Sequence, residues 1–194
     1  MISHQLELGY SIAGEYRPSQ GEVVEHLPGA LTLRDIEVLS YYSIKFARLR
    51  VDRAHGIAPH KPILLLSVIQ LIRVGSIKEN KIFLLPELND TFLRYWSYLG
   101  SDSHNPDISR PFFHLRGDKF WHLIPNPGFN KIIYSKIKPK NFAEVKRAVK
   151  YAYIDDILFD LLQNPVSKNS LITILVNKWF CHKPYQIEQI LLFS

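Results

Sequence analysis

A short, strongly basic stretch, RLRVDRAHGIAPHKPILLL at residues 48–66, contains the side chains best suited to binding an anion. The loop within it carries the basic residues Arg50, Arg53, His55, His60 and Lys61. Pro62 suits the first position of a helix, where a missing N–H group is not needed. Lys61 would then be the N-cap, and the free N–H groups of the first turn would lie beside basic side chains. Such a helix start favours phosphate. The other interpretation is an ordinary helix start in which His60 bonds its own backbone.

Positive charge is concentrated in two segments of the chain, whose formal net charge is +6. Residues 45–61 hold five Lys or Arg against one acid, and residues 131–150 hold seven against one. Concentrated positive charge is typical of proteins that bind polyanions. Two solvated helix faces would give the same pattern. On the first interpretation, Lys136 and Lys138 of the second segment, and Arg116 between the two segments, add phosphate contacts.

The aromatic segment RPFFHLRGDKFWHL, residues 110–123, differs in character from the sequence before it. Its halves PFFHL and KFWHL flank Arg116-Gly117-Asp118, which predicts a β-hairpin, with a third short strand at residues 132–134. Pro111 cannot donate to a sheet, so it is expected at a strand entry or edge. The rings of Pro111 and Phe112 would then form an apolar surface beside Arg110. Alternatively, the aromatic rings only pack in the core.

Candidate catalytic and metal-binding residues are few. Asp107, after Pro106, and the pair Glu144 and Lys146 have the letters of a PD-(D/E)xK nuclease, in which the acids hold Mg²⁺ and the lysine polarises water. However, Glu144 falls in the first turn of a predicted helix, whereas that motif needs a strand. His114 and His122, on paired strands of the predicted hairpin, lack nearby cysteines or carboxylates that would complete a metal site. We therefore expect no catalytic residues, no metal and no cofactor.

The composition is that of a globular protein, with 194 residues of which 46% are hydrophobic. Cys181 is the only cysteine, so no internal disulfide forms, and a reducing compartment is expected. No apolar run is long enough to span a membrane, and residues 1–14 lack the apolar core of a signal peptide. We expect a cytoplasmic protein of a bacterial-type cell, associated with the nucleoid and not with a membrane.

Hydrophobic spacing predicts a mainly α fold (α+β) with a small antiparallel β-hairpin or sheet. The helix from Pro62 to about Val74 is apolar on nearly every face and is expected at the centre of the core. Thr32 and Asn141 are predicted N-caps. The other predicted helices span residues 33–49, 88–99, 142–152, 154–162 and 170–180. Residues 1–32 are interpreted as an N-terminal arm, and residues 33–194 as a single DNA-binding domain in which 142–194 form a C-terminal helical part.

Two motifs, FARLRVDRAHGIAPHKPILLLSVI and RPFFHLRGDKFWHL, resemble the sulfur-binding domain of phosphorothioate-dependent, McrA-type (type IV) HNH restriction endonucleases. The similarity covers residues 42–123. It implies recognition of double-stranded DNA in which sulfur replaces a backbone phosphate oxygen. By this resemblance, His60 and Lys61 hold the modified phosphate. The implied sulfur pocket consists of Arg110, Pro111, Phe112 and His114.

The chemistry of sulfur agrees with such a pocket. Sulfur is less strongly hydrated than oxygen, so an apolar surface favours it, whereas a phosphate oxygen there would lose hydrogen bonds. No HNH motif follows Leu123, so we expect a non-catalytic recognition module whose nuclease domain or subunit is a partner. The alternatives are a Mg²⁺-dependent PD-(D/E)xK-like nuclease and a protein-interaction domain that binds an acidic partner.

Overall fold

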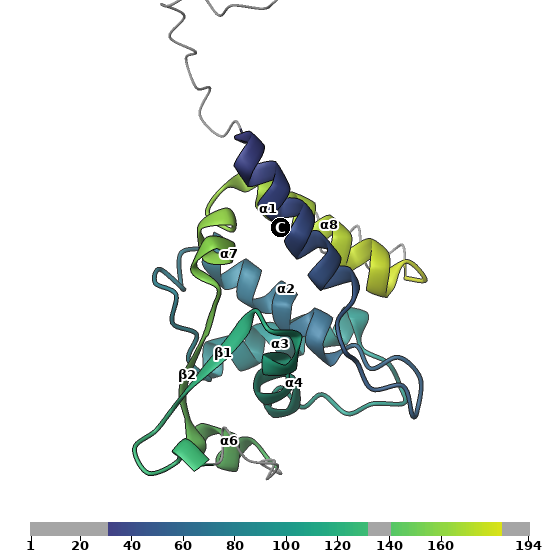
Figure 1. Ribbon diagram of the computed structural model, residues 1–194. Helices are drawn as coiled ribbons and strands as arrows, with labels where there is room; N and C mark the ends of the chain where they lie inside the picture. Colours follow the sequence, from purple (N-terminus) through teal and green to yellow (C-terminus); the bar gives the residue numbers. More distant parts are fainter. Residues whose placement is uncertain (1–30, 132–140, 184–194) are drawn as a thin grey trace, which may run out of the picture.

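The computed structural model describes residues 31–131 and 141–183, which form a mainly helical fold with one small sheet (Figure 1). The predicted fold class is therefore confirmed. Within the described residues, no helix is long and apolar enough to cross a membrane. In chain order, the elements are α1 (Leu33–Ala47), α2 (His60–Arg73), α3 (Pro86–Leu99), α4 (Ser109–His114), the 3-10 turn η1 (Leu115–Asp118), β1 (Trp121–Pro125), α6 (Phe142–Ala148), β2 (Val149–Ile154), α7 (Asp156–Leu161) and α8 (Pro165–Phe180).

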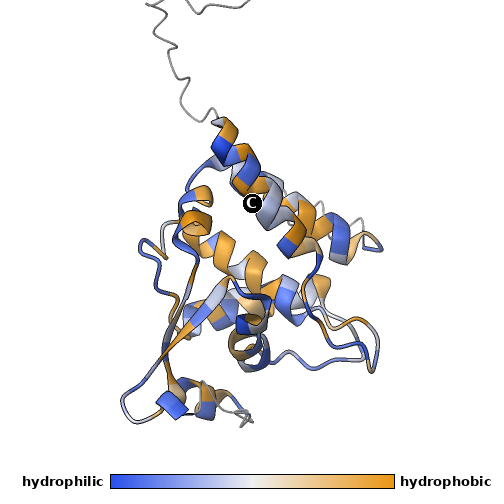
Figure 2. Cartoon of the chain, in the orientation of Figure 1, coloured by the Kyte–Doolittle hydropathy of each residue, from blue (hydrophilic) through white to orange (hydrophobic). Residues whose placement is uncertain are grey.

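Helix α2 is the central element of the core, as its sequence predicts. All of its residues from Lys61 to Ile69 are buried, and the helix packs against α3, α4 and α8. Its ribbon is largely orange, the colour of hydrophobic residues, in Figure 2. A helix that is apolar on every face is stable only when neighbours cover all of it. The N-terminal end of α2 is therefore held rigidly by the surrounding elements.

Helices α1 and α8 pack against each other and bring distant parts of the chain together (Figure 1). The indole N–H of Trp179 on α8 donates to the carbonyl of Phe46 on α1 at 2.8 Å. Thr32 caps α1 as predicted, in a capping box with Asp35. Helix α8 begins at Pro165, five residues before the predicted start, because Asn164 accepts hydrogen bonds from the first turn.

The predicted hairpin within residues 111–123 is wrong. Residues 109–114 form helix α4, in which the amide of Phe112 donates to the carbonyl of Ile108 at 3.1 Å. The carboxylate of Asp107 accepts from the amide of Ser109 at 2.9 Å and so satisfies a donor at the helix start. A proline is tolerated in a first turn, which explains how Pro111 lies inside a helix. The predicted strand at 132–134 lies outside the described residues.

The sheet instead pairs β1 with β2 in antiparallel register, with Trp121 opposite Ile154 and Leu123 opposite Ala152. The helix predicted over 142–152 therefore ends at Ala148, although its cap, Asn141, is confirmed. The β2 sequence VKYAYI is rich in β-branched and aromatic residues, which favour a strand. Ile82 adds two backbone hydrogen bonds to Ala152, of 2.7 and 2.8 Å.

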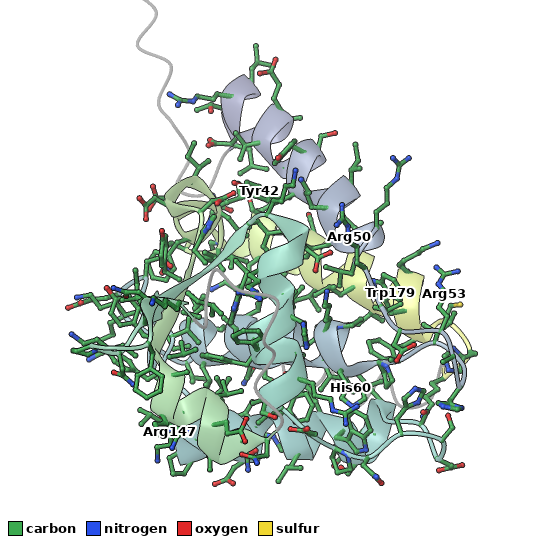
Figure 3. The ribbon with its side chains drawn as sticks, turned by 60° about the horizontal axis from the view of Figure 1, so that its bottom comes forward. Tyr42, Arg50, Arg53, His60, Arg147 and Trp179 are labelled. Carbon is green, nitrogen blue, oxygen red and sulfur yellow. The ribbon has the colours of Figure 1, made fainter. Side chains whose placement is uncertain are left out.

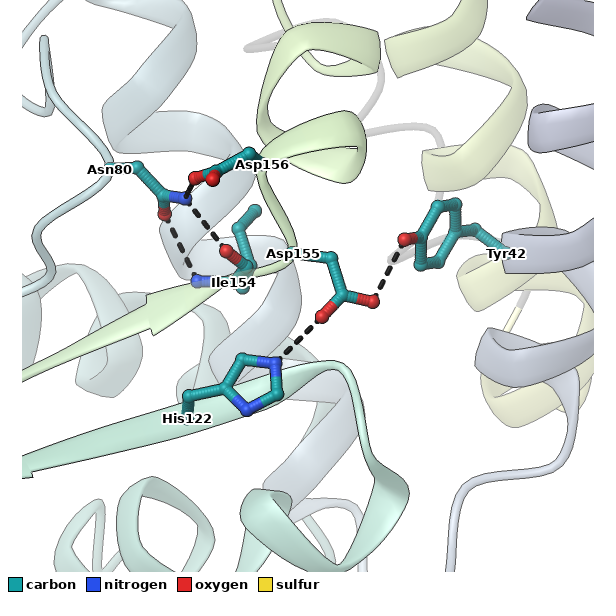
Figure 4. A network of polar contacts seen from close by, with 6 residues as sticks. All are labelled: Tyr42, Asn80, His122, Ile154, Asp155 and Asp156. Carbon is teal, nitrogen blue, oxygen red and sulfur yellow. Dashed lines mark hydrogen bonds and ion pairs between the residues drawn. The ribbon is translucent and has the colours of Figure 1, made fainter. Parts of the chain in front are cut away.

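A polar network beside the sheet joins α1 to both strands (Figure 4). Asp155, directly after β2, accepts from the hydroxyl of Tyr42 at 2.8 Å and lies 2.6 Å from Nε2 of His122. Burial and the neighbouring carboxylate raise the pKa of Tyr42, so its hydroxyl stays a donor. The network fixes the position of α1, and with it the start of the loop that follows α1.

Candidate functional site

A cavity of about 720 Å³ lies where the loop after α1, the start of α2 and helix α4 meet. It joins the two segments that carry the sequence motifs. Its lining contains six basic or imidazole side chains and one carboxylate, together with the apolar side chains of three further residues. The residues that line it are Arg50, Val51, Asp52, Ala58, His60, Lys61, His104, Arg110, Pro111, His114 and Gly117. This composition suits an anion that has one less hydrated side.

Helix α2 begins at His60, two residues earlier than predicted, with Pro59 at the N-cap. The placement of Pro62 at the first helical position and of Lys61 at the N-cap is therefore wrong. The amide of Ile63 already donates to the carbonyl of Pro59 at 3.0 Å. Because Pro62 has no N–H group, only the amides of His60 and Lys61 lack an acceptor inside the helix. The helix start therefore offers two backbone N–H donors, fewer than the sequence predicted, and both belong to residues that line the cavity.

Lys61 forms a buried ion pair with Asp118. Its Nζ lies 2.6 Å from Oδ2 of Asp118, and the two side chains are 11% and 4% exposed. The other carboxylate oxygen of Asp118 accepts from the amide of Arg50 at 2.8 Å. Asp118 thus ties η1 to the start of α2 and to the loop after α1. Sequence reasoning assigned Asp118 only to a turn, although it is the single acid in the second motif.

His60 is held by a distant carbonyl and not by its own backbone. Its Nε2 lies 2.9 Å from the carbonyl oxygen of Asn105, which only accepts, so Nε2 carries a proton. The ring also lies 4.6 Å from that of Trp96 and 5.6 Å from that of His104. Burial lowers the pKa of His60 below its ordinary value of 6.5, although the Asn105 carbonyl opposes this. Protonation therefore adds its proton at Nδ1.

Helix α4 supplies the wall opposite α2. Arg110 has a 73% exposed side chain whose Nε lies 3.4 Å from Oδ2 of Asp107. Pro111 and His114 line the cavity from the first and last turns of the same helix. Pro111 is mostly covered by its neighbours, yet it reaches the cavity surface. The expectation that it marks a strand entry or edge is wrong.

Phe112 is a core residue and not part of the cavity lining, so its predicted place in the sulfur pocket is wrong. Its side chain is fully buried, and its ring meets that of Trp121 edge to face at 5.5 Å. The indole N–H of Trp121 donates to the carbonyl of Phe112 at 2.9 Å. In a helix, consecutive residues point in different directions, so Pro111 and Phe112 cannot both face one small cavity.

The remaining predicted phosphate contacts lie elsewhere. Arg53 lines a second, smaller cavity, and His55 is exposed in the loop outside the first cavity. The guanidinium of Arg116 lies 4.1 Å from the ring centre of Phe113, and burial lowers its pKa. Lys136 and Lys138 lie outside the described residues. His104, which lines the first cavity, was missed because nothing in its local sequence distinguishes it.

The residues proposed for the alternative nuclease do not form its motif. Glu144 and Lys146 lie on helix α6, and the amide of Glu144 donates to Asn141 at 3.0 Å. The pairing of His114 with His122 on two strands is wrong, since His114 lies on α4 and His122 bonds Asp155. Over residues 31–131 and 141–183, no three His, Cys, Asp or Glu side chains gather in a way that could hold a metal.

Comparison with models of known protein families and with curated proteins finds no match to this chain. The interpretation of the cavity therefore depends on the side chains that line it.

Proposed function

We propose that this chain is a recognition module that binds double-stranded DNA carrying a phosphorothioate linkage. The observation that carries the proposal is the cavity itself, in which the basic start of α2 and Pro111 of α4 line one space. These residues are about 50 positions apart in sequence. A backbone linkage of DNA has both properties that the cavity addresses, a negative charge and, when modified, a weakly hydrated sulfur.

Affinity for the backbone comes from cations on the lining. Arg50 and Arg110 are exposed, and His60 gains a second N–H donor when it is protonated. The free amides of His60 and Lys61 add donors at the positive end of the α2 dipole. Contacts of this kind hold any DNA regardless of base sequence, and they weaken as salt rises.

Lys61 has a different role from the one that the sequence suggested. Its ammonium is balanced by Asp118 inside the protein, so it contributes less net charge to the cavity than an unpaired lysine. We assign it to holding the wall of the cavity in place and to orienting the first turn of α2. Its replacement is expected to weaken binding of modified and plain DNA alike.

Selectivity for sulfur comes from the apolar part of the wall, formed by Val51, Ala58 and Pro111. A phosphate oxygen placed against these groups loses hydrogen bonds to water, whereas sulfur loses much less. One such contact discriminates by about 1–3 kcal/mol, which is roughly 5- to 150-fold in the dissociation constant. The cations supply most of the binding, and the apolar wall supplies the preference.

In this proposal the module works with a nuclease domain or subunit that cleaves the recognised DNA. The setting is the cytoplasm of a bacterial-type cell, in association with the nucleoid. The module itself needs no metal or other cofactor for recognition.

The test compares sulfur-modified and plain duplexes of one sequence over a series of salt concentrations. We expect tighter binding of the modified duplex, and a slope of log K against log salt of about −4 to −5 if four to six phosphates are contacted. Pro111→Ala is expected to narrow the gap between the duplexes. Lys78→Ala, in the segment after the far end of α2, serves as the control.

The alternative functions are outcomes of the same test. Equal affinities for the two duplexes reject sulfur recognition, and a flat salt response rejects DNA binding. Absence of all DNA binding favours a protein-interaction domain with an acidic partner. Cleavage of either duplex in Mg²⁺ that Glu144→Ala abolishes favours the nuclease.

A further inference from the structure

A second cavity, of about 340 Å³, is lined by other residues of the loop between α1 and α2. Three segments build it: this loop, the end of α3 and the end of α8. Lys183, just beyond α8, donates from Nζ to the carbonyl of Gly100 after α3, so two of the three segments are directly joined. The residues that line the cavity are Arg53, Ile57, Pro59, Leu99, Gly100, Ser101, Lys178, Trp179, Phe180, Cys181 and His182.

The second cavity has an apolar floor and a basic rim. Leu99 and Phe180 are 1% exposed and form the floor, whereas Arg53, Lys178 and His182 are exposed. None of the described residues that line it is Asp or Glu. A rim of basic side chains without a balancing carboxylate attracts an anion.

The loop holds two of its three arginines, Arg50 and Arg53, at the two cavities. The amide of Ala58 donates to the carbonyl of Asp52 at 2.9 Å, which closes a short loop, and Gly56 has a φ of +93° that favours glycine. Arg50 lines the first cavity, and Arg53 lines the second. Figure 3 shows Arg50, Arg53, His60 and Trp179 on one side of the view, with Arg147 on the other.

Arg50 and Arg53, which line the two cavities, are close together in the chain. Three residues of extended chain span at most about 11 Å, which limits the separation of the Arg50 and Arg53 Cα atoms. Each DNA strand carries a phosphate about every 3.4 Å along the helix axis. A strand that places one linkage in the first cavity therefore passes close to the loop that carries Arg53.

We infer that the second cavity binds an unmodified phosphate of the same DNA, held between Arg53 on the loop and Lys178 and His182 at the end of α8. This inference rests on the proposed function and extends it to a second contact. The phosphate is bound at the exposed rim, whereas the floor residues Leu99 and Phe180 are only 1% exposed. The rim offers charge and hydrogen-bond donors to ordinary phosphate oxygens, so the second site is expected to add affinity without sulfur selectivity. The two roles can be tested separately. The first site is expected to set the ratio of the affinities for modified and plain DNA, and the second site to raise both affinities equally.

The experiment measures binding of the modified and plain duplexes by the Lys178→Ala/His182→Ala variant. We expect both affinities to fall by about tenfold, as for loss of a charged hydrogen bond, with the ratio between them unchanged. The salt slope is expected to become shallower by about 1 to 2. Arg53→Ala, on a separate segment, is expected to act in the same direction.

Lys78→Ala is the matched control, because it removes one exposed lysine beyond the opposite end of α2, about 21 Å along that helix. All replaced side chains are exposed, so melting temperatures are expected to stay within about 2 °C of the wild type.

The outcomes separate the two proposals. Unchanged affinities in the double variant and in Arg53→Ala overturn the second site and leave the first intact. A wild-type protein that binds both duplexes equally overturns sulfur recognition, while the variants still decide on the second site. A wild-type protein that binds no DNA overturns both.

Discussion

Replacing Asp118 by asparagine is expected to lower the free energy of unfolding by about 3–5 kcal/mol, because it leaves the Lys61 ammonium buried without its counter-charge. The pair is largely removed from solvent, with side chains 11% and 4% exposed, so water can replace the lost partner only in part. Asparagine keeps an oxygen that accepts from the amide of Arg50, so the loss reports on the charge pair. For a chain of this size, the melting temperature should fall by roughly 6–20 °C.

The assay is urea unfolding of Asp118→Asn, Lys61→Met and the double variant at one pH. In the double variant neither charge remains, so the loss is expected to be smaller than the sum of the single losses by about 1–3 kcal/mol. Lys78→Met is the control for loss of an exposed lysine, with an expected change within about 0.5 kcal/mol. Additive losses, or a loss below about 1 kcal/mol for Asp118→Asn, would refute the buried pair as the link between η1 and α2.

Four further predictions concern three residues, His60, Gly100 and Lys119. Burial lowers the pKa of His60 below 6.5, so just below pH 6.5 the unfolded chain binds more protons than the folded chain. The free energy of unfolding should therefore decrease as the pH falls below 6.5. His60→Gln should remove this pH dependence in urea unfolding. A bound phosphate favours the imidazolium, so DNA affinity should rise as the pH falls from 8 to 6, and an unchanged profile in His60→Gln would contradict this. Gly100→Ala should destabilise the protein by about 1–3 kcal/mol, since the added Cβ would lie 2.5 Å from Nε1 of Trp96; an unchanged melting temperature would refute the contact. Lys119 has a φ of +64°, a left-handed conformation that glycine adopts more easily than lysine. Lys119→Gly should therefore leave the free energy of unfolding unchanged or raise it by up to about 1 kcal/mol. A decrease of more than about 1 kcal/mol would show that the lysine side chain contributes to packing.

The elements with strong local signals were predictable from the sequence. The apolar run of α2, the Thr32 cap of α1 and the Asn141 cap of α6 each depend on residues within one or two turns. The predicted strand KFWHL overlaps β1, but its partner strand was not predictable in the same way. Strand β1 pairs with β2, whose residues follow α6 without a break and continue its apolar pattern, so the helix prediction ran through them.

The candidate site was predictable in its parts but not in its internal bonds. The two motifs contain Arg50, His60, Arg110 and Pro111, which were predicted as site residues, and all four line one cavity. The Lys61–Asp118 pair joins positions 57 apart, and no local pattern announces such a contact. The same holds for the bond from His60 to the carbonyl of Asn105, 45 positions away. Long-range polar pairs depend on the finished packing, which the local sequence does not encode.

Because α1 packs against α8, α1 cannot reach its final packing on the ribosome until α8 has been synthesised. Trp179 and Phe46 share a hydrogen bond across 133 positions of the chain. At about 5–20 residues per second, the first helix waits roughly 7–27 s for its partner to be synthesised. During that interval its apolar side stays uncovered, and the adjoining arginine-bearing loop has no fixed support. A nascent chain stopped before residue 165 should therefore be readily digested by protease, whereas a chain that includes α8 should resist digestion.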